Sequence, residues 1–264
     1  MDLGMAGHVA IVTGSAHGIG SGIAKVLARE GVSVVINYRT NREEAETVSA
    51  EINAAGGQAA PCQADVSNPT AAAELVRFAL DRFGRLDILV NNAGATVRKL
   101  FLQTTQEDLD LLINTNLRGV WNCCQAAGTH MVTRRYGRIL NCSSVSAIMP
   151  IAHQAAYASS KAAVLALTKV MAGELAPYNI ITNAVIPGLF ETPMSRPAIA
   201  ERGEELLSSI ALRRYAQPEE MGNSVAFLVS PLNKYISGAF IHVDGGKFAV
   251  QNPMRCWRDA GMIP

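Results

Sequence analysis

The sequence has little excess charge of either sign and no long apolar run, and each absence excludes a class of protein. Its 264 residues include 23 Lys and Arg against 22 Asp and Glu, a formal net charge of +1. This balance predicts neither nucleic acid nor an anionic membrane as an obligatory partner. No uncharged run reaches the roughly 18 residues of a membrane-spanning helix, and the first residues form no leader peptide. We therefore expect a cytoplasmic protein with no membrane partner.

The sequence also lacks the residue patterns of a metal centre or of a disulfide framework. Its five cysteines, Cys62, Cys123, Cys124, Cys142 and Cys256, are odd in number and show no C-x-x-C spacing. The five histidines have no metal-ligand spacing either. We expect no metal, and we interpret most of the cysteines as small apolar core residues.

The sequence contains instead a regular alternation of short β-branched runs and longer amphipathic segments. Buried strands are predicted at residues 8–14, 31–38, 58–65, 86–94, 137–144, 179–188 and 240–246. Helices are predicted at 18–30, from about residue 42, and at 69–83, 105–133 and 155–175. The stretch 189–217 carries Pro193 and Pro197 among charged residues and predicts a long irregular loop that acts as a lid.

Apolar strands separated by helices indicate an α/β fold with a parallel sheet covered on both faces. Right-handed crossovers then give a doubly wound, Rossmann-type sheet of seven strands. A closed eight-fold barrel is the competing fold, and the uneven helix lengths disfavour it. We expect one domain over residues 1–246 and a C-terminal tail over 247–264, which is either disordered or packed over a neighbouring subunit.

The first strand and the first helix are joined by a glycine-rich turn, TGSAHGIG at residues 13–20. Gly14 allows a tight turn, and Gly18 and Gly20 would let the backbone approach a pyrophosphate closely. The following helix would offer free N–H groups and the positive end of its dipole to phosphate. Its place between a strand and a helix favours a dinucleotide site over an ordinary turn.

The end of the second strand predicts whether the dinucleotide carries a 2′-phosphate. An acidic residue there would bind the adenosine ribose hydroxyls and repel a 2′-phosphate. This strand ends in Asn37, Tyr38 and Arg39, and no acid occurs before Glu43. Arg39 offers a planar, permanently charged group suited to a phosphate. We therefore expect NADP(H), with NAD(H) as the weaker alternative.

Tyr157 and Lys161 are four residues apart on a predicted helix and therefore share one face. Hydride addition to a ketone leaves negative charge on oxygen, so the reaction needs a proton donor. A phenol is a weak acid at neutral pH, and a nearby ammonium group would lower its pKa. We therefore expect Tyr157 to act as the acid or base and Lys161 to assist it.

The spacing G-x-x-x-G-x-G and a set of later landmarks resemble the short-chain dehydrogenase/reductase family over residues 5–246. The landmarks follow in the family order and are Asp65-Val66, NNAG at 91–94, Asn116 in NTNLRG, Ser144, Tyr157-x-x-x-Lys161, and Pro187-Gly188 followed by Thr192. Within the family the chain looks most like the 3-oxoacyl-carrier-protein reductases and related ketoreductases.

The resemblance implies roles for individual residues. Ser144 would hold the carbonyl oxygen, Lys161 would bind the nicotinamide ribose, and Asn116 would anchor a water that passes protons. His17 lies where NADP-preferring relatives often carry a basic residue. The cofactor site would comprise Gly14, Ser15, His17, Gly18, Ile19, Gly20, Tyr38, Arg39, Asp65, Val66, Asn92, Ala93, Gly94, Tyr157, Lys161, Pro187, Gly188 and Thr192.

Several alternatives for the activity remain open. The substrate would be a small carbonyl compound or alcohol, and the mainly apolar residues expected around it, 95–97, 145–154, Phe190 and Met194, suit a hydrophobic ketone. Arg135 matches a carrier-binding position of the reductases, whereas Tyr178 stands where another arginine is common. A sugar or alcohol dehydrogenase working oxidatively and a non-catalytic dinucleotide-sensing regulator are the alternatives. Relatives are usually homotetramers.

Overall fold

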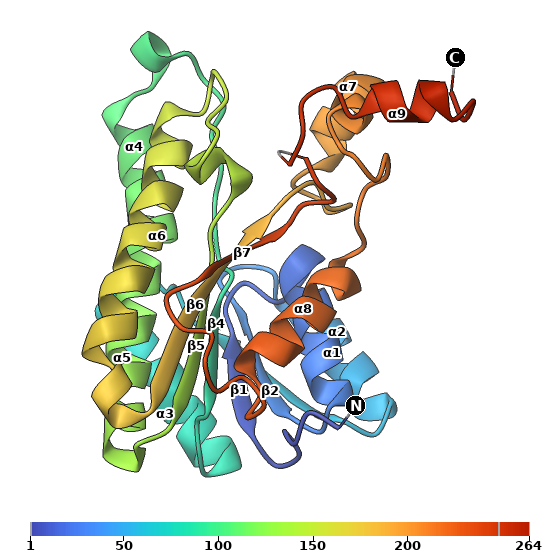
Figure 1. Ribbon diagram of the computed structural model, residues 1–264. Helices are drawn as coiled ribbons and strands as arrows, with labels where there is room; N and C mark the ends of the chain where they lie inside the picture. Colours follow the sequence, from blue (N-terminus) through green and yellow to red (C-terminus); the bar gives the residue numbers. More distant parts are fainter. Residues whose placement is uncertain (1, 248, 264) are drawn as a thin grey trace.

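Seven parallel strands form the centre of the computed structural model, which describes residues 2–247 and 249–263 (Figure 1). Their spatial order is β3-β2-β1-β4-β5-β6-β7. The strands are β1 (Val9–Val12), β2 (Ser33–Tyr38), β3 (Gln58–Gln63), β4 (Ile88–Asn91), β5 (Gly137–Cys142), β6 (Ile180–Pro187) and β7 (Phe240–Val243). The doubly wound α/β fold predicted from the sequence is confirmed.

The central strands are apolar throughout because both faces of the sheet are covered. Every residue of β1 and β4 is buried. Ile11 of β1 pairs with Val35 of β2 on one side and with Leu89 of β4 on the other. Such strands show no polar alternation, which is why unbroken apolar runs predicted them.

Helices lie on both faces of the sheet, in two layers (Figure 1). One layer contains α1, α2 and α8, whose buried side chains pack in one core cluster, and the other contains α3, α5 and α6. The helices are α1 (Gly18–Arg29), α2 (Arg42–Ala54), α3 (Pro69–Phe83), α4 (Gln106–Ile113), α5 (Gly119–Arg134), α6 (Ala155–Glu174), α7 (Arg196–Ser208), α8 (Pro218–Val229) and α9 (Met254–Asp259). The short helices are η1 (Phe101–Gln103), η2 (Asn114–Arg118), η3 (Val145–Ala147) and η4 (Ala176–Tyr178).

Helix α3 has the bounds expected from the sequence because both of its ends carry strong local signals. The Asn68 side chain accepts hydrogen bonds from the N–H groups of Thr70 and Ala71, and Pro69 is the first helical residue. Gly84 ends the helix in the left-handed conformation, with φ of 79°.

The long helix expected at 105–133 is divided in the structure. Thr105 and Asp108 form a capping box that begins α4, and α5 ends at Arg134. Between the two helices, η2 is a π-helical segment that contains Asn116. Such segments are rare and frequently occur at functional sites.

The irregular lid expected at 189–217 is partly helical, since α7 occupies its centre and is kinked at Arg202. A bridge between Phe190 and Ala216 closes the base of this excursion. Helix α8 follows directly and was not predicted. Its start carries a capping box between Gln217 and Glu220, a sequence pattern from which the start of this helix could have been predicted.

The described part of the tail contains helix α9, which differs from the alternative of a disordered tail. Helix α9 lies at the same end of the molecule as α7 (Figure 1). The Trp257 indole N–H donates to the Ala211 carbonyl at 2.9 Å, and Met254 is buried. These contacts are within the same chain, so the tail packs on its own lid rather than only on a neighbour.

No helix of the described part of the chain is both long and apolar enough to span a bilayer.

Candidate active site

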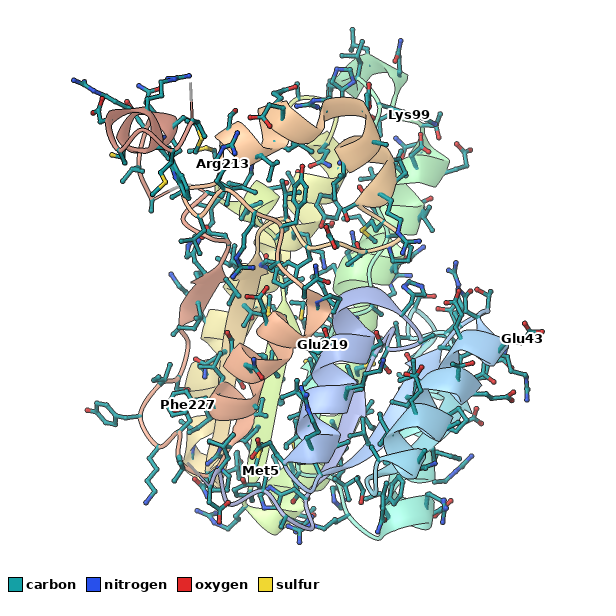
Figure 2. All side chains as sticks on the ribbon, turned by 90° about the vertical axis from the view of Figure 1, so that its right-hand side faces the viewer. Met5, Glu43, Lys99, Arg213, Glu219 and Phe227 are labelled. Carbon is teal, nitrogen blue, oxygen red and sulfur yellow. The ribbon has the colours of Figure 1, made fainter. Side chains whose placement is uncertain are left out.

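The strand order reverses between β1 and β4, which are neighbours in the sheet although their following helices lie on opposite faces. In such sheets ligands bind outside the carboxyl ends of the strands at this switch point. Figure 2 shows the two ends of the molecule, with Met5 at the amino edge of the sheet and Arg213, in the lid, beyond the carboxyl edge. The predicted site residues follow the carboxyl ends of β1, β2, β3, β4, β5 and β6.

The glycine turn after β1 requires glycine for two different reasons. Gly14 and Gly18 have φ of 61° and 57°, in the left-handed region that other residues rarely adopt. Gly20 is needed for close packing, since a Cβ there would lie 2.4 Å from the Gly14 carbonyl oxygen and 2.5 Å from Asn92 Nδ2. This packing holds the start of α1 against the turn.

The start of α1 suits an anionic group. His17 precedes the helix, no side chain caps it, and its first turn contains no acid, so the leading N–H groups are free of side-chain partners. His17 is exposed, Ser15 is buried with its hydroxyl on the Val12 carbonyl at 2.7 Å, and Ile19 packs against the core. These features fit the pyrophosphate of a dinucleotide.

Two residues that were not predicted as site residues organise the turn. The Thr13 hydroxyl accepts hydrogen bonds from the N–H groups of Asn92 and Ala93, both at 3.0 Å. It thereby joins the glycine turn after β1 to the segment 92–100 after β4, which is called the β4 loop. Asn37 is buried and its Oδ1 accepts from the Gly14 N–H at 3.2 Å. Asn92 Nδ2 donates to the Thr13 and Gly14 carbonyls. Thr13 opens the glycine turn motif and Asn37 lies near the end of the second strand, but neither pattern predicts these hydrogen bonds, because the partners are distant in sequence.

The end of β2 presents a cation and no carboxylate. Tyr38 is buried, whereas Arg39 is exposed, with its carbonyl accepting from Gln63 Nε2 at 2.9 Å. After β3, Asp65 is partly buried, and one of its carboxylate oxygens accepts from the N–H and the hydroxyl of Ser67. Val66 is buried beside it.

The loop after β6 lies next to the glycine turn. A Cβ on Gly18 would lie 3.3 Å from the Thr192 methyl group, so these two segments are in contact. Gly188 packs against the residue that follows β7, since a Cβ there would lie 2.5 Å from Asp244 Cα. Pro187, at the end of β6, is partly buried. The structure therefore brings the predicted cofactor residues of distant segments to one edge of the sheet.

The four predicted catalytic residues come from three elements and their flanking loops. Ser144 precedes η3, Tyr157 and Lys161 lie on α6, and Asn116 lies in η2. Lys161 and Asn116 are buried, and a Cβ on Gly94 would lie 3.4 Å from Lys161 Nζ and 3.3 Å from Asn116 Oδ1. Gly94 thus leaves the space in which these two polar groups face the β4 loop.

Hydrogen bonds within the chain hold the lysine and the asparagine. Lys161 Nζ donates to the Cys142 carbonyl at 2.9 Å. Asn116 Oδ1 accepts from the Ala95 N–H at 2.8 Å, and its Nδ2 donates to the Ala95 carbonyl and to Ser160 Oγ, both at 3.0 Å. The Asn116 amide hydrogens are therefore used by protein groups.

The electrostatics at Tyr157 differ from the expectation that Lys161 lowers its pKa. Burial raises the pKa of Tyr157, while its hydrogen bond with Ser144 and the charge of Arg98 act in the opposite direction. Burial also lowers the pKa of Lys161. Desolvation by burial is the largest influence on the pKa of both groups.

An apolar groove of about 650 Å³ lies beside these residues. Its lining shares residues 146, 147 and 150–153 with the predicted pocket, but adds Leu100, Phe101 and the exposed side of α6. The other predicted pocket residues are not in its lining, and Phe190 is buried while Met194 is exposed. Tyr157 does not line it either, so the groove adjoins the predicted catalytic residues without containing them.

Within the described ranges, 2–247 and 249–263, no group of three or more histidine, cysteine or acidic side chains could hold a metal ion.

A seven-stranded parallel sheet with a glycine turn at its switch point and a serine, tyrosine and lysine beyond its carboxyl edge defines a dinucleotide-dependent oxidoreductase fold. Comparison with known proteins agrees, because the family model described as Enoyl-(Acyl carrier protein) reductase matches residues 14–247. The chain belongs to the short-chain dehydrogenase/reductase family and acts on CH–OH or C=O groups.

The similar curated proteins and solved structures belong to this family. The chain is 42% identical over 239 residues to the 3-oxoacyl-[acyl-carrier-protein] reductase FabG of Staphylococcus aureus, covering 90% of this chain and 97% of that protein. A reductase of the same name from Synechocystis is 42% identical over 240 residues, covering 90% and 96%. A putative short-chain alcohol dehydrogenase from Sinorhizobium meliloti has a TM-score of 0.91 at 34% identity, covering 95% of this chain and all of that one. A putative gluconate 5-dehydrogenase from Beutenbergia cavernae with bound NADP has a TM-score of 0.89 at 34% identity and covers 95% of this chain.

Proposed function

We propose that this chain is an NADP(H)-dependent ketoreductase in which Tyr157 is the general acid or base. The observation that carries the proposal is the convergence of Ser144, Tyr157, Lys161 and Asn116 beside the glycine turn, at one edge of the sheet. When bound, the nicotinamide would supply or accept the hydride. The residues of this chain would hold it, orient the carbonyl and move one proton.

The glycine turn and the start of α1 would hold the pyrophosphate, and the loop at Thr192 would cover it. Arg39 is exposed at the end of β2, and His17 is exposed in the glycine turn. These two side chains would bind the 2′-phosphate of NADP. Because no carboxylate stands after β2, nothing there would repel this phosphate. NAD(H) would lack the group that Arg39 binds.

The proton would move at the Tyr157 phenol oxygen. Ser144 forms a hydrogen bond with Tyr157 and would also hold the substrate oxygen, so the two hydroxyl groups would polarise the carbonyl together. Lys161 is buried close to the β4 loop, beside Asn116, and would bind the nicotinamide ribose. Asn116 would hold the loop at Ala95 in place.

A 3-oxoacyl thioester or a small hydrophobic ketone is the substrate that we favour. The FabG relatives at 42% identity support the former, and the apolar groove supports either one. Arg135 lies at the end of α5 and donates to the Pro177 carbonyl at 2.9 Å, and Tyr178 is partly exposed nearby. A single arginine there would give an acidic carrier protein a weaker contact than two would.

Oxidation of a sugar acid or alcohol is the second candidate, because two of the similar structures are putative gluconate dehydrogenases. A dinucleotide-sensing regulator is the third candidate, and the retained Tyr157 and Lys161 count against it. The family description also names an enoyl reductase, which reduces a C=C bond.

The absorbance of NADPH, followed against a panel of substrates, tests the proposal. The panel contains a 3-oxoacyl thioester, a small ketone, an enoyl thioester and, with NADP, gluconate. We expect NADPH oxidation by a carbonyl compound, and Tyr157→Phe should lower kcat by about 10²–10⁴-fold while cofactor binding is retained. Tight NADPH binding with no turnover of any member would contradict the proposal and favour the regulator.

We also propose a homotetramer, as in most family members. Helices α5 and α6 expose Trp121 and Val170, which are 52% and 55% accessible, and the segment before β7 exposes Tyr235 completely. Large exposed apolar side chains on two separate faces suit two interfaces. Light scattering coupled to size-exclusion chromatography measures the mass, and a monomer would contradict this assembly.

We also propose that residues 1–246 form a single domain and that the protein is cytoplasmic. Expression of residues 1–246 alone and fractionation of cells test them.

A further inference from the structure

Ser160 was not among the predicted site residues, although it lies between Tyr157 and Lys161 in the sequence. It is completely buried near the start of α6. Its hydroxyl donates to the Tyr157 carbonyl at 2.7 Å and accepts from Asn116 Nδ2 at 3.0 Å. One side chain therefore joins the carbonyl of the predicted acid to the asparagine of the π-helical segment.

The partner of Ser160 is itself fixed. Asn116 forms two hydrogen bonds to the backbone of Ala95, so the amide plane cannot turn without losing them. The loop at Ala95 follows β4 directly and includes Gly94, which lies against Lys161 Nζ. The path from β4 through Asn116 and Ser160 to Tyr157 consists of hydrogen bonds between buried and part-buried groups.

The catalytic turn of α6 is held from its other side as well. The Ser143 hydroxyl donates to the Lys161 carbonyl at 2.8 Å. The carbonyls of Tyr157 and Lys161 thus each accept an additional bond, one from Ser160 and one from Ser143. A helix end held by its internal bonds alone would fray more readily than this one.

We propose that Ser160 is a positioning residue, which joins Asn116 to the Tyr157 carbonyl and thereby fixes the phenol and the ammonium group relative to the β4 loop. This role rests on the proposed reductase function. Ser160 does not touch the substrate. It acts through Tyr157, whose proton transfer depends on placement to within about half an ångström.

The test compares Ser160→Ala with Thr133→Ala. Thr133 is an exposed residue of α5 whose hydroxyl also donates to the carbonyl three residues before it, at 2.8 Å, but joins no other element. We expect Ser160→Ala to lower kcat about tenfold with the KM for NADPH changed less than about twofold, and Thr133→Ala to change neither. Ser160→Ala with kcat within about twofold of the parent would overturn the proposal, whatever its melting temperature.

A double-mutant cycle with Asn116→Ala separates positioning from general destabilisation. If Ser160 acts through this link, Ser160→Ala should cost much less in the Asn116→Ala background than in the parent. Equal costs in both backgrounds would show that Ser160 does not act through Asn116.

The pH dependence gives a second readout. The groups that act on the pKa of Tyr157 are Ser144 before η3, Arg98 in the β4 loop and Cys142 at the end of β5. Because burial raises the pKa of Tyr157, loosening its turn should lower that pKa toward the ordinary value. The alkaline fall of the reduction rate should therefore begin at a lower pH in Ser160→Ala than in the parent.

NMR of ¹³C-labelled tyrosine measures the same pKa without turnover, with Tyr157→Phe assigning the signal. If the parent reduces no substrate, the proposed function fails, and the NMR titration still decides on Ser160. An identical Tyr157 titration in the parent and in Ser160→Ala would overturn the positioning role.

Discussion

Gly20 and Tyr157 are constrained at the scale of single residues by what surrounds them. At Gly20 the neighbouring carbonyl and amide groups leave no space for a Cβ, so only glycine fits at this position. At Tyr157 the surroundings raise the pKa by burial, so its chemistry is set by solvation. Arg39 is different, because it is exposed and its role depends on a ligand alone.

Replacing Arg39 by aspartate should reverse the preference between cofactors. The carboxylate would repel the 2′-phosphate and accept hydrogen bonds from ribose hydroxyls, so the KM for NADPH should rise about tenfold or more and that for NADH should fall. Steady-state kinetics with both cofactors measure this. Arg29→Asp, with the same charge change at the far end of α1, is the control. Unchanged kinetics in Arg39→Asp would contradict the NADP(H) assignment.

The two reaction directions should depend on pH with opposite signs. Reduction needs protonated Tyr157, so its rate is full below the pKa and falls as pH rises through it. Oxidation needs the phenolate and rises over the same interval. Because burial raises the pKa, the transition should lie on the alkaline side. Rate–pH profiles in both directions, with Tyr157→Phe as the control, check this, and rates that fall together with rising pH would speak against Tyr157.

At the scale of elements, the lid is held at both of its ends. The bridge between Phe190 and Ala216 closes its base, and the Glu191 N–H donates to the Ala216 carbonyl at 2.9 Å. Beyond α7, the Leu212 N–H donates to the Gly245 carbonyl at 3.0 Å, and Trp257 binds Ala211. The family model ends at residue 247, so the α9 contact lies outside the shared part of the fold.

Removing residues 249–264 should loosen the lid. The deletion takes away the Trp257 bond and the buried Met254, so trypsin should cut at Arg202, Arg213 and Arg214 several times faster. Limited proteolysis followed by mass spectrometry measures the rates. Trp257→Phe, which keeps the ring but loses the N–H donor, should have a smaller effect. Equal cleavage of the parent and the deletion variant would show that the tail does not restrain the lid.

At the scale of the whole molecule, a cluster of structural charges and the predicted catalytic residues lie at opposite edges of the sheet. At the amino edge, the buried Asp87 carboxylate binds the Arg85 guanidinium at 2.7 Å and 2.8 Å, lies 3.3 Å from Arg134 Nη1, and accepts from the Val9 N–H. Asp87 therefore connects β1, the segment that precedes β4, and α5. The predicted catalytic residues lie at the carboxyl edge, at the other end of the strands.

Asp87→Asn should lower stability without altering the reaction. Loss of the charge leaves two guanidinium groups without their carboxylate, so the free energy of unfolding should fall by about 2–4 kcal/mol. Urea unfolding measures this, and kcat per folded molecule should equal that of the parent. Glu74→Gln, which removes an exposed ion pair with Arg77, should change stability little. A large fall in kcat for Asp87→Asn would contradict this separation.

Local patterns predicted most of the fold. The apolar runs, the Asn68 and Gly84 signals and the glycine turn depend on residues close in sequence, and the structure confirms the elements that they predicted. The π-helical segment and α7 were missed because tertiary contacts decide them. Thr13, Asn37 and Ser160 were missed as site residues because each has a partner distant in sequence, 80 positions away for Thr13 and Ala93, 23 for Asn37 and Gly14, and 44 for Ser160 and Asn116.

The sequence by itself determined the parallel sheet, the family and the residues that approach one another, since spacing and apolar patterns are properties of the chain. Only the tertiary structure decided how those residues are held. Asn116 is committed to Ala95 and Ser160, the pKa of Tyr157 is raised rather than lowered, and the tail packs on the lid. The reason is physical: desolvation and hydrogen-bond geometry depend on what surrounds a group in space, and the order of residues does not specify those distances.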